Sequence, residues 1–167
     1  MGVEIERKFT VRADFCPQVA GTEMAQGYLS RDPQRTVRVR LAGGRGYLTV
    51  KGETRGMVRA EYEYEIPPSD ARAMLALCDP PLVEKTRYVV DATGRRWEVD
   101  VFHGANEGLV VAEVELPSET AEVTLPAWVE REVTGEKRYY NSSLIVHPYH
   151  SWTAEEKSGY PRVPVEK

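Results

Sequence analysis

Charged residues recur at every second position in six short segments of the sequence. The series are Glu4, Glu6 and Lys8; Arg38 and Arg40; Glu61, Glu63 and Glu65; Lys85 and Arg87; Glu98 and Asp100; and Glu113 and Glu115. Residues two apart lie on the same face of a β-strand, so each series would present its charges together. Arginine and lysine bind phosphate oxygens, and carboxylates bind hard divalent cations such as Mg²⁺ and Mn²⁺. The pattern therefore favours metal-assisted phosphoryl transfer on a polyanionic substrate.

Eight segments predict the β-strands that would position these charges. In each segment, β-branched and aromatic residues alternate with polar ones, and clusters of Gly, Pro and Asp separate the segments. The predicted strands cover residues 3–11, 24–30, 36–41, 46–51, 59–66, 82–91, 95–102 and 109–116. Short turn-forming connections such as Asp32-Pro33 and Thr93-Gly94 separate several of them, so neighbouring strands are expected to run antiparallel.

Helices are predicted in three places. One follows Pro67-Pro68, with Ser69 as its candidate N-cap, and ends before Asp79. A helix start is predicted at residues 126–129 and a C-terminal helix within residues 135–146. From Thr153 onward Glu, Lys, Pro and Gly dominate without periodicity. This change predicts one domain over residues 1–152 and a flexible tail over residues 153–167.

The alternating charges have a simpler explanation, which is a sheet with one solvated face. Two features favour an enclosed surface instead. Like charges lie side by side, whereas a solvated surface would be expected to mix signs. Almost every predicted strand also contributes to one set of seven basic and nine acidic positions. The basic positions include Lys51 and Arg59 in addition to the series above.

Closure of eight strands into a barrel would bring these charges together. The interior of such a barrel is wide enough for side chains or for one small ligand. We therefore predict an α+β, mainly β fold: an eight-stranded antiparallel closed barrel with helices packed outside and the apolar strand faces turned outward.

The overall composition limits the classes of partner. The chain has 167 residues, of which 41% are hydrophobic, and its formal net charge of -4 argues against non-specific binding to nucleic acid. Cys16 and Cys78 are far apart in the sequence and lack metal-ligand spacing, so neither a disulfide nor a zinc site is expected. No secretory signal and no long apolar run is evident. We expect a cytoplasmic protein without a membrane partner.

The segment Glu4-Ile5-Glu6-Arg7-Lys8 resembles the ExExK signature of the CYTH superfamily, the triphosphate tunnel metalloenzymes. Further segments match the family in order along the chain. They are Thr36-Val37-Arg38-Val39-Arg40, Leu48-Thr49-Val50-Lys51-Gly52, Glu61-Tyr62-Glu63-Tyr64-Glu65, Glu84-Lys85-Thr86-Arg87-Tyr88, Trp97-Glu98-Val99-Asp100, Ala112-Glu113-Val114-Glu115 and Val133-Thr134-Gly135. The resemblance covers about residues 2–150 and points to bacterial single-domain inorganic triphosphatases.

The resemblance implies a role for each matching residue in a tunnel that binds a linear triphosphate with Mg²⁺ or Mn²⁺. The implied phosphate ligands are Lys8, Arg38, Arg40, Lys51, Lys85 and Arg87, with Arg59 as a weaker candidate. The implied metal ligands are Glu4, Glu6 and Glu115, followed by Glu113 and Asp100. Glu61, Glu63 and Lys85 are the candidate catalytic residues, the two glutamates lying near the terminal phosphate. Lys137 resembles a lysine of the helix that plugs one end of the tunnel.

The expected reaction is hydrolysis of inorganic tripolyphosphate to pyrophosphate and phosphate. The family also contains thiamine triphosphatases, RNA 5'-triphosphatases and class IV adenylate cyclases, so an organic triphosphate stays an alternative substrate. A non-catalytic module that binds polyphosphate or a nucleoside triphosphate is the alternative from another class. The partner is thus expected to be a small-molecule triphosphate, and the chain either a monomer or a homodimer.

Overall fold

The computed structural model describes residues 2–159, and these residues form nine strands and several short helices. The strands are β1 (Gly2–Val11), β2 (Thr22–Ser30), β3 (Arg35–Ala42), β4 (Arg45–Gly52), β5 (Val58–Ile66), β6 (Val83–Ala92), β7 (Arg95–Phe102), β8 (Val110–Glu115) and β9 (Val129–Glu132). The α-helices are α1 (Pro68–Leu75), α2 (Asn141–Val146) and α3 (Ala154–Lys157). Single 3-10 turns are η1 (Gly104–Asn106), η2 (Lys137–Tyr139) and η3 (Tyr149–Ser151). No helix in the described part of the chain is long and apolar enough to cross a membrane.

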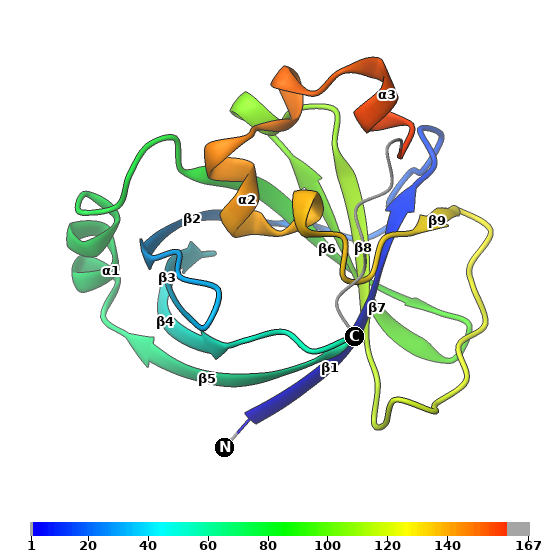
Figure 1. Ribbon diagram of the computed structural model, residues 1–167, viewed down its shortest axis with the longest axis horizontal. Helices are drawn as coiled ribbons and strands as arrows, with labels where there is room; N and C mark the ends of the chain where they lie inside the picture. Colours follow the sequence, from blue (N-terminus) through cyan, green and yellow to red (C-terminus); the bar gives the residue numbers. More distant parts are fainter. Residues whose placement is uncertain (1, 160–167) are drawn as a thin grey trace.

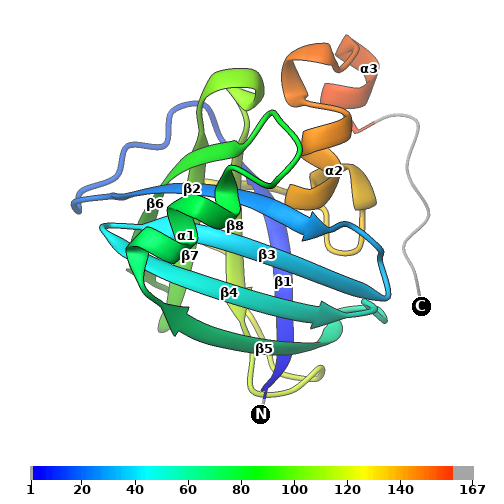
Figure 2. The same cartoon turned by 90° about the vertical axis from the view of Figure 1, so that its left-hand side faces the viewer.

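The first eight strands form a closed antiparallel barrel. Each strand hydrogen-bonds to its neighbours in the order β5-β4-β3-β2-β6-β7-β8-β1, and pairing of β1 with β5 closes the circle. Figure 1 shows the barrel with α2 over one end, and Figure 2 shows β2 to β5 side by side on its wall. The predicted architecture is confirmed, because the eight strands predicted from alternation correspond to β1 to β8.

The first strand divides one of its edges between two partners. Gly2 to Ile5 pair with β5, whereas Phe9 to Val11 pair with β9. The helix start predicted at residues 126–129 is therefore wrong, because β9 begins at Val129. Beyond Ile5 the backbone of β1 needs new hydrogen-bond partners on this edge, and β9 supplies them.

Helix α1 packs on the outer face of β3 and β4. Its buried residues Ala71 and Leu75 form an apolar cluster with Val39. The predicted N-cap is wrong by two positions: Pro67 is the N-cap, its side chain cannot cap, and Ser69 lies inside the helix. Pro68 at the first helical position explains the shift, since its ring favours the helical backbone angle there.

A second apolar cluster lies outside the barrel on β1, β7 and β8. Phe9, Trp97 and Val114 are fully buried there, and Trp128 packs edge-on against Trp97 with ring centroids 5.5 Å apart. The segment before β9 thus covers this face, as expected for outward-facing apolar residues of a barrel whose interior is polar.

A third cluster fills one end of the barrel interior. Val83, Phe102 and Val111 lie on the inward strand faces, in line with Lys85, Asp100 and Glu113, and pack against the C-terminal segment. This finding corrects the expectation that apolar residues all face outward. The contacting C-terminal residues include Tyr139, Leu144 and Ile145. We call residues 134–146 the plug segment.

The plug segment contains η2 and α2 instead of one continuous helix over residues 135–146. Tyr140, between them, has an extended backbone with φ -69° and ψ 135°, which interrupts the helical path. The predicted tail also differs in its first part: Thr153 caps α3 through a capping box with Glu156. The rest of that tail, residues 160–167, lies outside the described residues.

Leu144→Ala should lower the free energy of unfolding by about 2–5 kcal/mol, because truncating a buried leucine leaves a cavity. Leu144 is fully buried in the plug cluster, whereas Val146 on the same helix is 67% exposed. Val146→Ala is therefore the matched control and should change stability little. Urea denaturation of the three proteins measures both effects, and an equal loss in the two variants would contradict the packing described here.

Candidate active site

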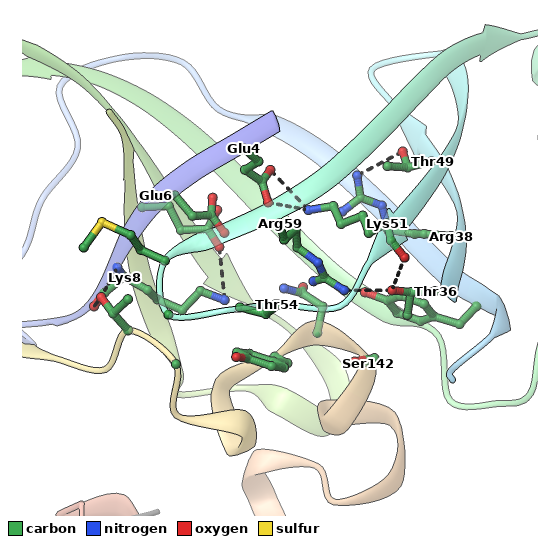
Figure 3. Close-up of a pocket in the computed structure, with 18 of the residues that line it drawn as sticks. Glu4, Glu6, Lys8, Thr36, Arg38, Thr49, Lys51, Thr54, Arg59 and Ser142 are labelled. Carbon is green, nitrogen blue, oxygen red and sulfur yellow. Dashed lines mark hydrogen bonds and ion pairs between the residues drawn. The ribbon is translucent and has the colours of Figure 1, made fainter. Parts of the chain in front are cut away.

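The barrel interior contains two adjoining cavities. They share six lining residues from five strands: Glu4, Glu6, Arg38, Lys51, Arg87 and Glu113. The first cavity extends to the plug segment, where Tyr140, Asn141 and Ser142 line it (Figure 3). The second extends to the β6–β7 turn at Gly94. The two cavities together form one charged lumen that runs along the barrel.

Nearly all the predicted site residues meet in this lumen. Those on its walls are Glu4, Glu6, Lys8, Arg38, Arg40, Lys51, Arg59, Glu61, Glu63, Lys85, Arg87, Glu113 and Glu115. They come from six of the eight barrel strands, β1, β3, β4, β5, β6 and β8. Barrel closure thus converts the alternation seen in separate strands into a single binding site. Asp100 and Lys137 are the two predicted residues that line neither cavity.

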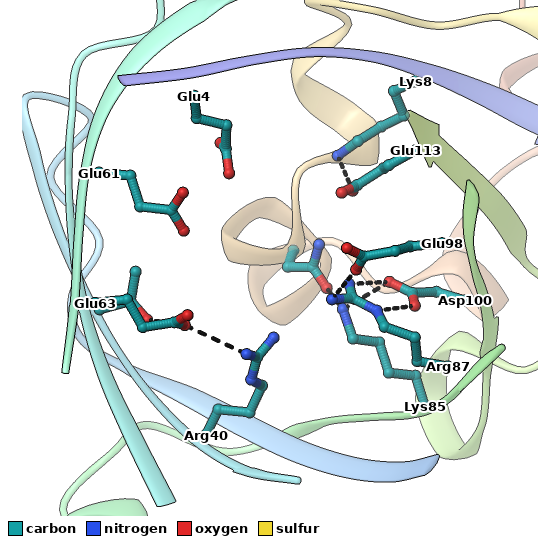
Figure 4. A network of polar contacts seen from close by, with 12 residues as sticks. Glu4, Lys8, Arg40, Glu61, Glu63, Lys85, Arg87, Glu98, Asp100 and Glu113 are labelled. Carbon is teal, nitrogen blue, oxygen red and sulfur yellow. Dashed lines mark hydrogen bonds and ion pairs between the residues drawn. The ribbon is translucent and has the colours of Figure 1, made fainter. Parts of the chain in front are cut away.

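Asp100 is on the inward face of β7 but is itself buried, and it binds two cations there. Its Oδ2 is 2.8 Å from Nζ of Lys85, and Arg87 donates to both carboxylate oxygens at 2.7 and 2.9 Å (Figure 4). Burial by itself would raise the pKa of Asp100, but the two cations outweigh burial and hold that pKa well below its usual range. Both oxygens are thus engaged in holding cations, which favours a positioning role over the predicted metal-binding role.

Burial has the opposite effect on Lys85. The side chain is 1% exposed, and burial together with the neighbouring Arg87 lowers its pKa to about 8 in spite of Asp100. A third contact comes from the plug segment, where Oδ1 of Asn141 accepts a hydrogen bond from Nζ of Lys85 at 3.1 Å. The ammonium group is therefore held in one place at the lumen wall.

Three glutamates repel one another on the β1 and β8 side of the lumen. Burial raises the pKa of Glu6 well above its ordinary value, and the nearby charges of Glu113 and Glu4 raise it further. Glu6 also lies directly opposite Glu115 in the β1–β8 pairing. Like charges in such a position are destabilising unless a counter-charge is present. A divalent cation would supply that charge, so the donor set fits a hard metal ion.

Lysines compensate two of these carboxylates in the structure. Nζ of Lys51 is 3.0 Å from Glu4, and Nζ of Lys8 is 3.3 Å from Glu113. Within residues 2–159, no three His, Cys, Asp or Glu side chains are gathered closely enough to be recognised as a metal site. Of the four carboxylates that would bind a metal, Glu4 and Glu113 are thus paired with lysines in the structure.

Glu63 and Glu61 form the opposite acidic wall on β5. Oε1 of Glu63 accepts from Thr49 at 2.9 Å and lies 3.3 and 3.4 Å from the guanidinium groups of Arg40 and Arg38. Glu61 lies 3.8 Å from Nζ of Lys51 and also shares a side-chain hydrogen bond with Glu4. Burial raises the pKa of Glu61 to about 7, although Lys51 opposes the shift. Glu61 can therefore accept a proton near neutral pH.

The arginines of β3 are crowded. Burial, together with the charges of Arg38 and Arg87, lowers the pKa of Arg40 to about 10. The Nε atoms of Arg38 and Arg40 are buried and have no hydrogen-bond partner in the described structure. Unused donors on adjacent guanidinium groups are suited to a polyanion with several oxygens.

Lys137 lies outside the lumen. Its side chain is exposed and lines a neighbouring pocket together with Arg31, Ser143 and His147. The plug segment does reach the lumen, but through the uncharged residues Tyr140, Asn141 and Ser142. Charge alternation carries no signal for uncharged residues, so the sequence did not indicate these three.

The comparisons with known proteins agree with this geometry. A model of the CYTH domain matches residues 2–149, and the chain therefore belongs to the CYTH family. An inorganic triphosphatase of Acetivibrio thermocellus is 51% identical over 151 residues, which cover 89% of this chain and 97% of that protein. An inorganic triphosphatase of Nitrosomonas europaea is 36% identical over 147 residues, with 86% and 97% covered.

A solved structure supports the same assignment. The crystal structure of an inorganic triphosphatase superimposes with a TM-score of 0.64 at 35% identity, covering 86% of this chain and 97% of that one. This solved relative thus shares the fold over most of both chains.

Asp100→Asn should lower the free energy of unfolding by about 3–5 kcal/mol at neutral pH, because it leaves the buried Lys85 without its carboxylate partner, whereas Arg87 keeps its ion pair with Glu98. The native pKa of Asp100 is depressed, so its contribution is complete above the unfolded pKa of about 3.9 and is lost as the pH falls toward the native pKa. The difference between wild type and variant should therefore shrink in acid. Denaturation at several pH values measures it. Glu65→Gln, which removes an exposed pair with Arg45, is the control and should have little effect.

Proposed function

We propose that this protein hydrolyses inorganic tripolyphosphate to pyrophosphate and phosphate in a reaction that requires Mg²⁺ or Mn²⁺. The observation that carries the proposal is the closed lumen in which crowded arginines and lysines face mutually repelling glutamates. A bound polyanion would relieve the first repulsion and a divalent cation the second. The inorganic triphosphatases that resemble this chain over most of its length support the same reaction.

Glu4, Glu6 and Glu115 are the residues that would hold the metal ion, with Glu113 beside them. Oxygen ligands of this kind are those that Mg²⁺ and Mn²⁺ prefer. When bound, the ion would supply positive charge that neutralises phosphate oxygens and the departing pyrophosphate. Asp100 is left out of this set, because Lys85 and Arg87 occupy both of its oxygens.

The cations of the lumen would bind and align the triphosphate. Arg38 and Arg40 offer adjacent guanidinium groups on one wall, and Lys8, Lys85 and Arg87 lie across the lumen. Phosphate oxygens would replace Glu113 as the partner of Lys8, while Asp100 holds Lys85 and Arg87 in place. Because phosphoryl transfer depends mainly on positioning and charge neutralisation, a rigid set of cations contributes directly to catalysis.

Glu61 is the residue best placed to accept a proton from the attacking water. A new bond forms between the water oxygen and the terminal phosphorus, the bridging P–O bond breaks, and pyrophosphate leaves with the bonding electron pair. The water proton passes to the Glu61 carboxylate, whose pKa of about 7 suits a general base at neutral pH. Glu63, held by Thr49, would keep Arg38 and Arg40 in place beside it.

Phosphate release from tripolyphosphate, ATP and thiamine triphosphate, each with Mg²⁺ or Mn²⁺, tests the proposal. We expect tripolyphosphate to be the best substrate and EDTA to abolish turnover. Preference for an organic triphosphate would replace the substrate but keep the reaction class. Formation of cyclic AMP from ATP would indicate a cyclase instead. Tight binding without turnover of any substrate would contradict the enzyme and favour a binding module.

Single substitutions test the assigned roles. Glu6→Gln should reduce turnover to background because it removes a metal ligand. Lys8→Ala should raise KM and lower kcat, with kcat/KM falling by about 100-fold or more, since it removes a cation from the lumen. Glu119→Gln, at an exposed position on the loop before β9, is the control and should retain full activity. Wild-type kinetics for Glu6→Gln would contradict the metal assignment.

A further inference from the structure

The plug segment contacts both buried lysines of the lumen. Nζ of Lys8 lies 3.5 Å from the backbone oxygen of Tyr139 and 5.5 Å from the centre of the Tyr140 ring. Nζ of Lys85 donates to Oδ1 of Asn141 at 3.1 Å. The segment therefore forms part of the lumen wall at the point where the two lysines face the cavity.

Lys85 determines the orientation of the Asn141 amide. An ammonium group can only donate hydrogen bonds, so the amide atom that faces it must be the oxygen. Lys85 itself cannot swing away easily, because it is 1% exposed and held by Asp100 at 2.8 Å. The amide nitrogen, Nδ2, is consequently the atom of Asn141 that is free to face elsewhere.

The amide nitrogen has two N–H donors and no acceptor in the described part of the chain. Within residues 2–159, the hydrogen bond with Lys85 is the one polar contact of the Asn141 side chain. Asn141 also lines the first lumen cavity. Donors that face a polar cavity without a protein partner are available to a ligand or to water. Phosphate oxygens, which accept several hydrogen bonds each, suit such a donor.

We propose that Asn141 is a substrate-binding residue whose amide nitrogen donates to a phosphate oxygen of the bound triphosphate. This inference rests on the proposed function and adds to it an uncharged, directional contact from the plug segment. Lys85 acts on this contact by holding the amide oxygen, and so couples the position of the plug to the position of the substrate. A neutral donor also adds no further charge to cations that already repel one another.

Two substitutions separate this role from simple positioning of Lys85. Asn141→Ala removes both the acceptor for Lys85 and the donor to substrate. Asn141→Asp keeps an acceptor for Lys85 but replaces the donor by a second acceptor. If Asn141 only positions Lys85, the aspartate variant should bind substrate at least as well as the alanine variant. If the amide donates to phosphate, the aspartate variant should be the worse of the two.

Affinity for tripolyphosphate in EDTA, measured by calorimetry, gives the direct readout because no turnover occurs. We expect Asn141→Ala to weaken binding by about tenfold, as for one hydrogen bond to a charged group, and Asn141→Asp to weaken it further. KM should rise in parallel in the presence of Mg²⁺. Melting temperatures close to wild type would show that both variants keep the plug in place.

Two controls lie on the same helix. Ser142→Asp adds the same negative charge to the same cavity wall without touching Lys85, and so reports repulsion at a distance. Ser143→Ala, in the neighbouring pocket, should leave binding unchanged.

The inference is overturned if Asn141→Ala binds like wild type, or if Asn141→Asp loses no more affinity than Ser142→Asp. A wild-type protein that neither binds nor hydrolyses tripolyphosphate would instead overturn the proposed function.

Discussion

The ion network around Asp100 determines which charged side chains can be buried in the middle of this barrel. Lys85 and Arg87 are buried cations, and burial of a charge without a partner is costly. Asp100 supplies the counter-charge from the next strand, so both cations can stay ionised at the lumen wall. Both side chains are thereby held in place at the lumen wall; under the proposed function, this positioning would reduce the reorganisation that substrate binding requires.

Other ion pairs extend around the lumen. Glu63 lies between Arg38 and Arg40, Glu4 faces Lys51, and Glu113 faces Lys8. These carboxylates neutralise the cations in the structure; under the proposed function, a triphosphate would take the place of Glu4 and Glu113 at Lys51 and Lys8, while Glu63 keeps Arg38 and Arg40 in place. The carboxylates thus compensate the positive charge of the lumen. Closure of the barrel by β1 and β5 encloses these pairs within one wall.

The plug segment links this electrostatic centre to the rest of the fold. Leu144 and Ile145 belong to the apolar cluster that fills one end of the barrel, and Asn141 at the start of the same helix contacts Lys85. The packing of α2 therefore determines where the uncharged amide of Asn141 meets Lys85 at the lumen wall. Stability at that end of the barrel and geometry in the lumen depend on the same six-residue helix.

Local alternation in the sequence determined the strands and the face on which each charge lies, because side-chain direction in a strand depends only on position along the chain. It thus predicted the barrel and most of the charged residues of the lumen. Tertiary structure alone decided that Asp100 binds Lys85 and Arg87, that β9 replaces a predicted helix, and that Asn141 reaches the lumen while Lys137 does not. Those outcomes depend on which strands become neighbours and on how a distant C-terminal segment packs, and no local pattern encodes either contact.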